Sequence, residues 1–216
     1  MNIIKKIKFL FNRSKKERFL YEQCAYHESG HIVMAYLSGF TCKRVTILQN
    51  GSGDGFTEFD YGESSTTILI TSIINFSEYP EEFYLLSKNI QADAPQVASK
   101  ICGTLLGGPV SEALHKAGVG FEGELPIEVA GSDCQRVNSI SFFLSGINGA
   151  REHNQNIIPD LYNVVHFLRK KKIWKVIDTL SNDILHSSTR SLNQQEIENS
   201  LQKSGYLDII KSKMCP

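Results

Sequence analysis

The sequence predicts a mostly helical domain of the α+β kind with one small antiparallel sheet. Three observations support this fold class. Residues 25–39 have the pattern of a helix with a broad apolar surface, residues 43–61 resemble two short strands joined by a glycine-rich turn, and the C-terminal third has helical periodicity. The chain has 216 residues, 41% of them hydrophobic, which is enough for one well-buried domain.

The first of these elements carries two histidines four residues apart. In the stretch "AYHESGHIVMAYLSG", residues 25–39, His27 and His31 lie one above the other on the same helix face, and Glu28 directly follows the first. This is the H-E-x-x-H pattern, in which two imidazoles bind one metal ion and the glutamate acts as general base. An ordinary buried helix with two hydrogen-bonded histidines is the alternative interpretation.

Two glycines frame this helix. Gly30 lies inside it and costs about 1 kcal/mol relative to alanine. We therefore expect Gly30 to let another element approach the helix closely. Gly39 is expected to end the helix.

The remaining elements follow from periodicity and turn residues. A hairpin is predicted from the β-branched stretch 43–48, the turn 49–55 and the returning strand 56–61. Residues 62–92 are a mixed segment. Further helices are predicted over 94–118, 132–146, 159–171, 173–188 and 193–205, with a glycine-rich loop at 118–132 and a C-terminal helical bundle. In the last helix, Asn193 and Glu196 have capping-box spacing and Gly205 is the C-terminal cap.

Composition narrows the class of protein. Basic and acidic residues are equal at 23 each, so bulk charge gives no reason to expect nucleic acid binding. Five cysteines without a C-x-x-C pair are typical of reduced thiols in a cytoplasmic protein. No apolar run approaches the length of about 20 residues that spans a bilayer, and no signal peptide is recognisable.

The N-terminal segment, residues 1–20, departs from this balanced charge. Residues 1–19, "MNIIKKIKFLFNRSKKERF", are strongly basic and carry apolar residues at roughly helical spacing. This segment is either a solvated helix or a peripheral contact with an anionic membrane surface.

A catalytic zinc site needs a third protein ligand beside the two histidines. The extended metzincin pattern is excluded, because Met34 and Leu37 stand where it requires glycine and histidine. Glu112 in "LGGPVSEAL" and Asp133 in "AGSDCQRV" are the main candidates. The remaining candidates are His115 and His153.

Five motifs in order resemble the peptidase domain of the FtsH-type ATP-dependent zinc metalloprotease family. They are "YHESGH", "KRVTIL" with "GFT", "LLGGPVSEAL", "AGSDCQRV" and "RSLNQQEI", and together they cover roughly residues 22–204. H-E-x-x-H is common to many families, whereas the glycine pair with its glutamate, followed by Ser-Asp, is much more specific.

The resemblance implies a zincin-like peptidase domain over residues 21–205. It implies that His27, His31 and Asp133 bind Zn²⁺, that Glu28 is the catalytic base, and that Glu112 orients a ligand histidine. Two departures stand out: no P-loop of the family's ATPase module is recognisable, and Pro109 replaces the arginine usual after the glycine pair. Residues 62–92 are expected to be an insertion, and residues 206–216 a C-terminal tail.

These inferences predict a zinc metalloendopeptidase that hydrolyses unstructured peptides or flexible segments without ATP. We expect the strand at Val45, Thr46 and Ile47 to hold an extended substrate by strand addition. The alternative is an inactive interaction module that keeps the fold, associated with a membrane surface through its N-terminus. An oligomer or a separate ATPase partner is possible, but no feature of the sequence supports either.

Overall fold

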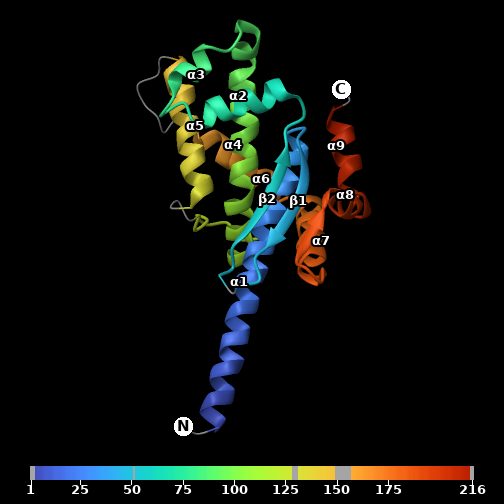
Figure 1. Ribbon diagram of the computed structural model, residues 1–216. Coiled ribbons are helices and arrows are strands. Elements are labelled where there is room, and N and C mark those ends of the chain that lie inside the picture. Colours follow the sequence, from blue (N-terminus) through green and yellow to red (C-terminus); the bar gives the residue numbers. More distant parts are fainter. Residues whose placement is uncertain (1–2, 51, 128–130, 149–156, 215–216) are drawn as a thin grey trace.

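The structure is a computed structural model. It describes the backbone of residues 3–50, 52–127, 131–148 and 157–214, and the side chains of residues 17–50, 52–127, 131–147 and 161–210. The fold is mostly helical with a small three-stranded antiparallel sheet, as predicted (Figure 1). The described helices are α1 (Ile3–Leu37), α2 (Ser64–Ile74), α3 (Pro80–Tyr84), α4 (Lys88–Ala117), α5 (Ser132–Asn148), α6 (Ile157–Leu168), α7 (Lys171–His186), α8 (Gln194–Lys203) and α9 (Tyr206–Met214).

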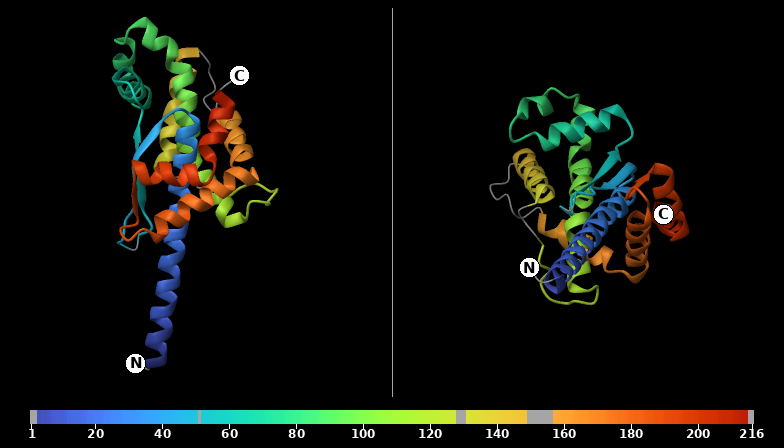
Figure 2. Two further views of the ribbon diagram at one scale, coloured as in Figure 1. Left: turned by 90° about the vertical axis from the view of Figure 1, so that its right-hand side faces the viewer. Right: turned by 60° about the horizontal axis from the view of Figure 1, so that its bottom comes forward.

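Helices α1 and α4 form the centre of the molecule and lie side by side (Figures 1 and 2). Their backbones approach most closely at Gly30 and Gly107. A Cβ atom added at Gly107 would lie 2.5 Å from the carbonyl oxygen of Gly30, and one added at Gly30 would collide with the carbonyl oxygen of Gly107. This contact confirms the close approach expected at Gly30. It places the middle of α4 directly against the histidine-bearing turns of α1.

The sheet packs against α1 and contains one strand that the sequence did not predict. Strands β1 (Thr41–Ile47) and β2 (Gly55–Asp60) form the expected antiparallel hairpin. The short strand β3 (Ser191–Asn193) pairs with the other side of β1, over Arg44 to Thr46. The strand order is therefore β2-β1-β3, with β1 in the middle.

The C-terminal helices cover α1 on the side of α7 (Figure 1). The predicted capping box is present: the Asn193 side chain accepts a hydrogen bond from the Glu196 amide, and Glu196 accepts one from the Asn193 amide. Gly205 follows α8 with a φ of 76°, as expected of a C-terminal cap. Residues 206–214, expected as part of a tail, instead form α9, because Tyr206 is fully buried and donates a hydrogen bond to the Val33 carbonyl.

The segment 62–92 is ordered as α2, α3 and the first turn of α4, which begins at Lys88 rather than at residue 94. Phe76 and Phe83 from this segment pack edge-to-face against Phe143 of α5. Most of the basic N-terminal segment belongs to α1, although the side chains of residues 1–16 lie outside the described ones. Among the described residues, no helix has the length and apolarity that crossing a membrane requires.

Candidate metal centre

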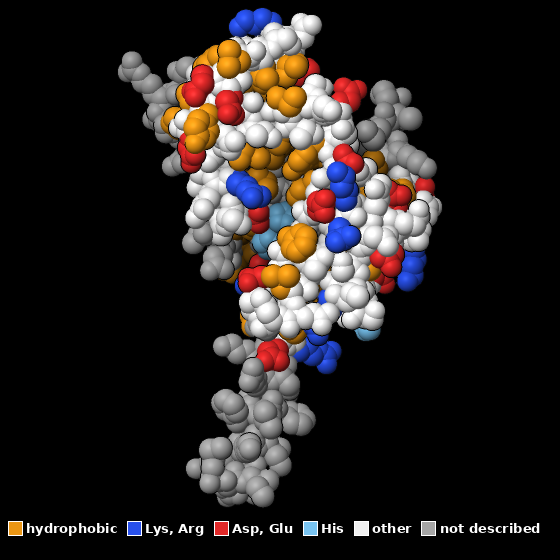
Figure 3. Space-filling model, in the orientation of Figure 1, with side chains coloured by type: hydrophobic (Ala, Val, Ile, Leu, Met, Phe, Trp, Pro, Cys, Tyr) orange, Lys and Arg blue, Asp and Glu red, His pale blue; other side chains and the backbone are white. Residues whose placement is uncertain are grey.

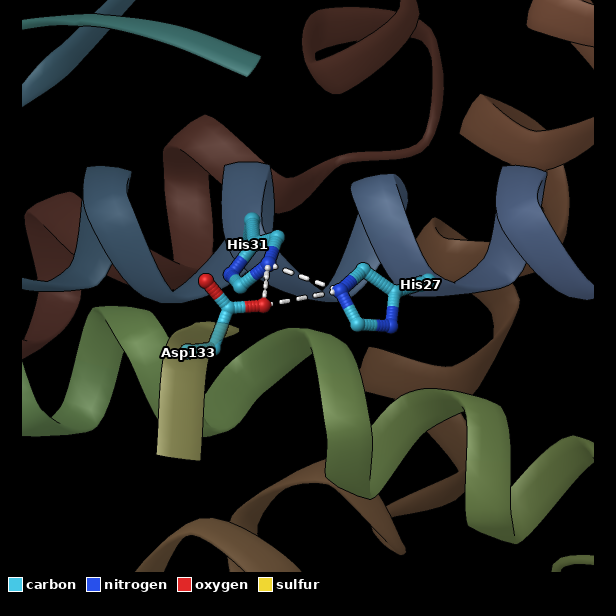
Figure 4. A group of neighbouring side chains, drawn as sticks. All are labelled: His27, His31 and Asp133. Atoms are coloured by element: carbon cyan, nitrogen blue, oxygen red, sulfur yellow. Dashed lines mark hydrogen bonds and ion pairs between the residues drawn. The ribbon is translucent and has the colours of Figure 1, made fainter. Parts of the chain in front are cut away.

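Three predicted ligands converge on one point between α1, α4 and α5 (Figure 4). His27 and His31 project from successive turns of α1, and Asp133 lies in the first turn of α5. The two Nε2 atoms are 3.1 Å apart, and Oδ2 of Asp133 lies 3.0 Å from Nε2 of His27 and 3.2 Å from Nε2 of His31. The structure thus brings together the residues that the sequence marked as metal ligands.

Hydrogen bonds on the far side of each ring fix its tautomer. Nδ1 of His31 lies 2.8 Å from the Thr104 carbonyl oxygen, which can only accept, so Nδ1 carries the proton. Nδ1 of His27 lies 3.0 Å from Oε2 of Glu112, and an ionised carboxylate also only accepts. In the neutral rings both Nε2 atoms are therefore unprotonated. Two nitrogen lone pairs and a carboxylate oxygen face one another at hydrogen-bonding distance, which is repulsive unless a cation or a proton lies between them.

The spacing of the three atoms suits a small cation. Zinc binds imidazole nitrogen and carboxylate oxygen at about 2.0–2.2 Å, and tetrahedral ligands at that distance are roughly 3.3 Å apart. The observed separations of 3.0, 3.1 and 3.2 Å are close to that value. His27, His31 and Asp133 can therefore hold a metal ion with only small side-chain movements.

In the metal-free protein a proton takes the place of the cation. Burial lowers the pKa of His27, but its hydrogen bonds with Asp133 and Glu112 outweigh burial and raise that pKa to about 9. Burial would raise the pKa of Asp133, but the hydrogen bonds from His27 and His31 bring it well below its usual range. The site therefore attracts positive charge strongly, and a metal ion must displace a proton from it.

Glu112 lies behind His27, as the resemblance implied. Its Oε2 atom accepts from His27, and its Oε1 atom accepts from Nζ of Lys116 at 2.5 Å, one helical turn further along α4. The hydrogen bond from His27 lowers the pKa of Glu112 to about 2, against the effect of burial and with further help from Lys116. Glu112 therefore stays ionised and orients His27 toward the metal position.

Gly108 makes room for the two imidazoles. A Cβ atom added there would lie 2.6 Å from Nε2 of His27 and would collide with Nε2 of His31. The glycine pair in α4 thus has two separate functions: Gly107 permits the crossing with α1, and Gly108 leaves space for the metal-binding nitrogens.

Glu28 lies beside the three converging side chains but is not one of them. It is buried, at 4% exposure, and its Oε2 atom accepts a hydrogen bond of 2.7 Å from the Thr57 hydroxyl on β2. Gly55 lies beside the other oxygen, because a Cβ atom added there would be 3.1 Å from Oε1 of Glu28. Thr57 therefore fixes the carboxylate through Oε2 and leaves Oε1 as the oxygen that it does not occupy.

These groups line a cavity of about 240 Å³ between β2, α1 and α5. The space-filling view shows it as a hollow with histidine at its floor and hydrophobic side chains around it (Figure 3). Phe59 stands edge-on to His31, with ring centroids 6.2 Å apart. The lining residues are His27, Glu28, His31, Gly55, Phe56, Thr57, Phe59, Leu105, Ser132, Asp133 and Arg136.

The prediction that Val45, Thr46 and Ile47 hold an extended substrate is wrong. β1 is paired with β2 on one side and with β3 on the other, and the Ile47 amide donates to the Arg190 carbonyl. Val45 and Ile47 are also buried. Strand addition needs unpaired backbone groups, and in the described part of the sheet the free edge beside the cavity belongs to β2.

Of the other two candidate third ligands, His115 does not join the cluster. His115 stacks on Tyr26, with ring centroids 3.7 Å apart, and Tyr26 stacks in turn on Trp174. His153 lies outside the described residues.

Thr57, Thr104 and Arg136 were not predicted from the sequence to belong to the site. Thr57 could have been noticed as the last residue of "GFT". Thr104 acts through its backbone carbonyl, so its side-chain identity carried no signal for this contact.

Comparison with known proteins adds no assignment. Neither models of protein families, nor curated protein sequences, nor solved structures gave a match to this chain. The site's own geometry must therefore carry the functional inference.

Proposed function

We propose that this chain is a zinc-dependent metallopeptidase with a zincin-like arrangement of its H-E-x-x-H helix. The observation that carries the proposal is the convergence of His27, His31 and Asp133 on one point, in a cavity that the Glu28 carboxylate also lines. Two imidazoles and one carboxylate, with a fourth position left open, form a donor set typical of catalytic zinc. The motif resemblance to the FtsH-type peptidase domain supports the same assignment.

Zinc, when bound, supplies Lewis acidity that makes a water molecule more acidic and polarises a peptide carbonyl. The protein's own residues then move the proton. Glu28 accepts it from the attacking water and passes it to the leaving amine. Because Thr57 occupies Oε2, the atom that carries the proton is Oε1, beside Gly55. Glu112 and the Thr104 carbonyl hold the two imidazoles in the tautomer that leaves Nε2 free.

The substrate lies along the free edge of β2. This strand borders the cavity from Gly55 to Phe59, so an extended peptide paired with it passes directly over the metal ligands. Such pairing requires a segment without structure of its own. The preferred substrates are therefore unstructured peptides and flexible protein segments, because a peptide bond inside a stable domain is exposed only in the small unfolded population.

The test combines metal analysis with peptide digestion. The purified full chain should bind about one zinc and cleave a mixed set of unstructured peptides, equally well with and without ATP. Glu28→Gln should keep the zinc and lose about 10²–10⁴-fold in activity, because an amide cannot accept the proton. Asp133→Ala should lose the zinc. Glu81→Gln is the matched control, since Glu81 is exposed on α3 and does not line the cavity.

Three results would contradict the proposal. Full zinc occupancy without cleavage of any peptide would favour a non-catalytic metal-binding module. Equal hydrolysis by the parent protein and Glu28→Gln would assign the activity to a contaminant or to another base. Zinc retained by Asp133→Ala but lost from Glu112→Ala would move the third ligand to Glu112.

A further inference from the structure

One charged side chain of the cavity, that of Arg136, takes no part in the proposed reaction. Arg136 lines the same cavity as the metal ligands and Glu28. It lies three residues after Asp133 on α5, so the two side chains share a helix face. Arg136 is exposed, and within the described part of the chain no hydrogen bond or ion pair is found for its guanidinium. Figure 3 shows a basic side chain at the rim of the hollow, close to the histidines on its floor.

Arg136 acts electrostatically at the Tyr61 end of β2. Burial raises the pKa of Tyr61, and the positive charge of Arg136 works against that rise. Arg136 and Phe59 of β2 line the same cavity, and Tyr61 follows Phe59 just past the end of that strand. Along β2, Thr57 contacts Glu28 and Phe59 stands edge-on to His31, so both contacts come before Tyr61 in the order of the strand.

The charge balance of the metal-loaded cavity favours an anionic ligand. Glu28 and Asp133 supply two negative charges, and Arg136 supplies one positive charge. A divalent cation on neutral histidines would leave the cavity with one surplus positive charge. Glu112 does not alter this balance, because Lys116 pairs with it. One carboxylate on the bound peptide restores neutrality, and a guanidinium binds a carboxylate through two parallel hydrogen bonds.

We propose that Arg136 recognises a carboxylate of the peptide substrate, a specificity that rests on the proposed peptidase function. The carboxylate is either an Asp or Glu side chain close to the scissile bond or the free carboxyl terminus of the peptide. Recognition takes place at the Tyr61 end of the groove, to one side of the metal. Arg136 thereby selects the peptide and sets its register along β2.

The test measures discrimination between matched peptides by the zinc-loaded full chain. One set is amidated at the C-terminus and carries a single Glu or Gln at each position around the cleaved bond in turn. A second set lacks acidic side chains and ends in either a free acid or an amide, one to three residues past that bond. We expect kcat/KM to be about tenfold higher for the acidic member at one position, corresponding to about 1.4 kcal/mol. The set in which this occurs identifies the source of the carboxylate.

Variants assign the discrimination to the guanidinium. In Arg136→Gln the ratio of kcat/KM between acidic and neutral members should fall to about one, and in Arg136→Glu it should fall below one, because the new carboxylate repels the acidic member. Arg44→Gln is the matched control, because Arg44 is exposed on β1 and does not line the cavity. It should keep the ratio of the parent protein.

A uniform loss of kcat in Arg136→Gln on every peptide, with the ratio unchanged, would overturn the inference and assign Arg136 to the reaction itself. So would a parent protein that cleaves acidic and neutral peptides equally, although the peptidase function would then stand. If no peptide is cleaved, that function fails instead. Binding of the same peptides to zinc-loaded Glu28→Gln, with or without Arg136→Gln, then decides the inference by whether the acidic preference depends on Arg136.

Discussion

The cavity has a helical wall, formed by α1 and α4, and a strand wall, formed by β2, and the two are built in different ways. On the helical wall, each metal-binding histidine is held from behind by a second group, the Thr104 carbonyl for His31 and the Glu112 carboxylate for His27. On the strand wall, the Thr57 hydroxyl of β2 holds Glu28. Arg136 of α5 lines the same cavity, and its guanidinium has no hydrogen-bond or ion-pair partner among the described residues. In the proposed peptidase, the helices set metal affinity, whereas β2 and the rim of α5 set reactivity and selectivity.

The most disruptive single change on the helical wall should be Gly108→Ala. The added methyl group occupies the space of the two Nε2 atoms, so metal binding should be abolished and activity with it. Gly103→Ala on the same helix is the control, since its Cβ atom would meet only Met34 Cε, at 3.5 Å. Zinc titration of both variants checks the prediction, and equal zinc affinity in the two would contradict it.

A smaller effect on the same wall is expected from Glu112→Gln. The amide no longer holds the Nδ1 proton of His27 through a charged acceptor, and loss of such a partner typically costs 10–100-fold in metal affinity. Activity at saturating zinc should recover most of the parent value. Competition with a chelator of known affinity measures the change. Unaltered affinity would leave Glu112 as a partner of Lys116 alone.

On the strand wall, Thr57→Val should change the reaction without changing the metal site. The valine preserves the shape of threonine but removes the hydrogen bond to Glu28, and hydrogen bonds to charged groups are worth about 1.5–3 kcal/mol. We expect kcat to fall by about tenfold or more, with zinc affinity unchanged. Thr57→Ser, which keeps the hydroxyl, should restore most of the rate. A parallel loss of zinc would show that the two walls are not independent.

The pH dependence of stability should separate the metal-free and metal-bound proteins. The pKa of His27 rises from 6.5 to about 9 on folding, so its protonated form stabilises the metal-free protein fully below about pH 6.5. This contribution disappears as the pH rises through about 9. Zinc binding should behave in the opposite way, because fewer protons compete at high pH. The increase in Tm on adding zinc should therefore be larger at pH 8.5 than at pH 6.5, and an equal increase would contradict the assignment of the proton to His27.

Local rules determined much of the helical wall from the sequence alone. The spacing of His27 and His31 places both rings on one face of any helix, whatever packs against it. Asn193 with Glu196 marked the start of α8, because a capping box depends only on neighbouring residues in the chain. Gly30 signalled a close helix contact, although its partner Gly107 could not be identified from the sequence. Asp133 remained one of several candidate ligands by sequence. The motif resemblance favoured it, and the structure brings it to the histidines.

Only the tertiary structure decided the strand wall. β1 reads as one strand of a simple hairpin, but Ser191 to Asn193 return from the far end of the chain to pair with its other side. That contact moves the free edge of the sheet, and with it the proposed peptide-binding strand, from β1 to β2. The hydrogen bond from His31 to the Thr104 carbonyl and the position of Arg136 in the cavity could not be predicted from the sequence either. Each depends on which backbone or side chain lies opposite after folding, and residue type and spacing carry no information about that.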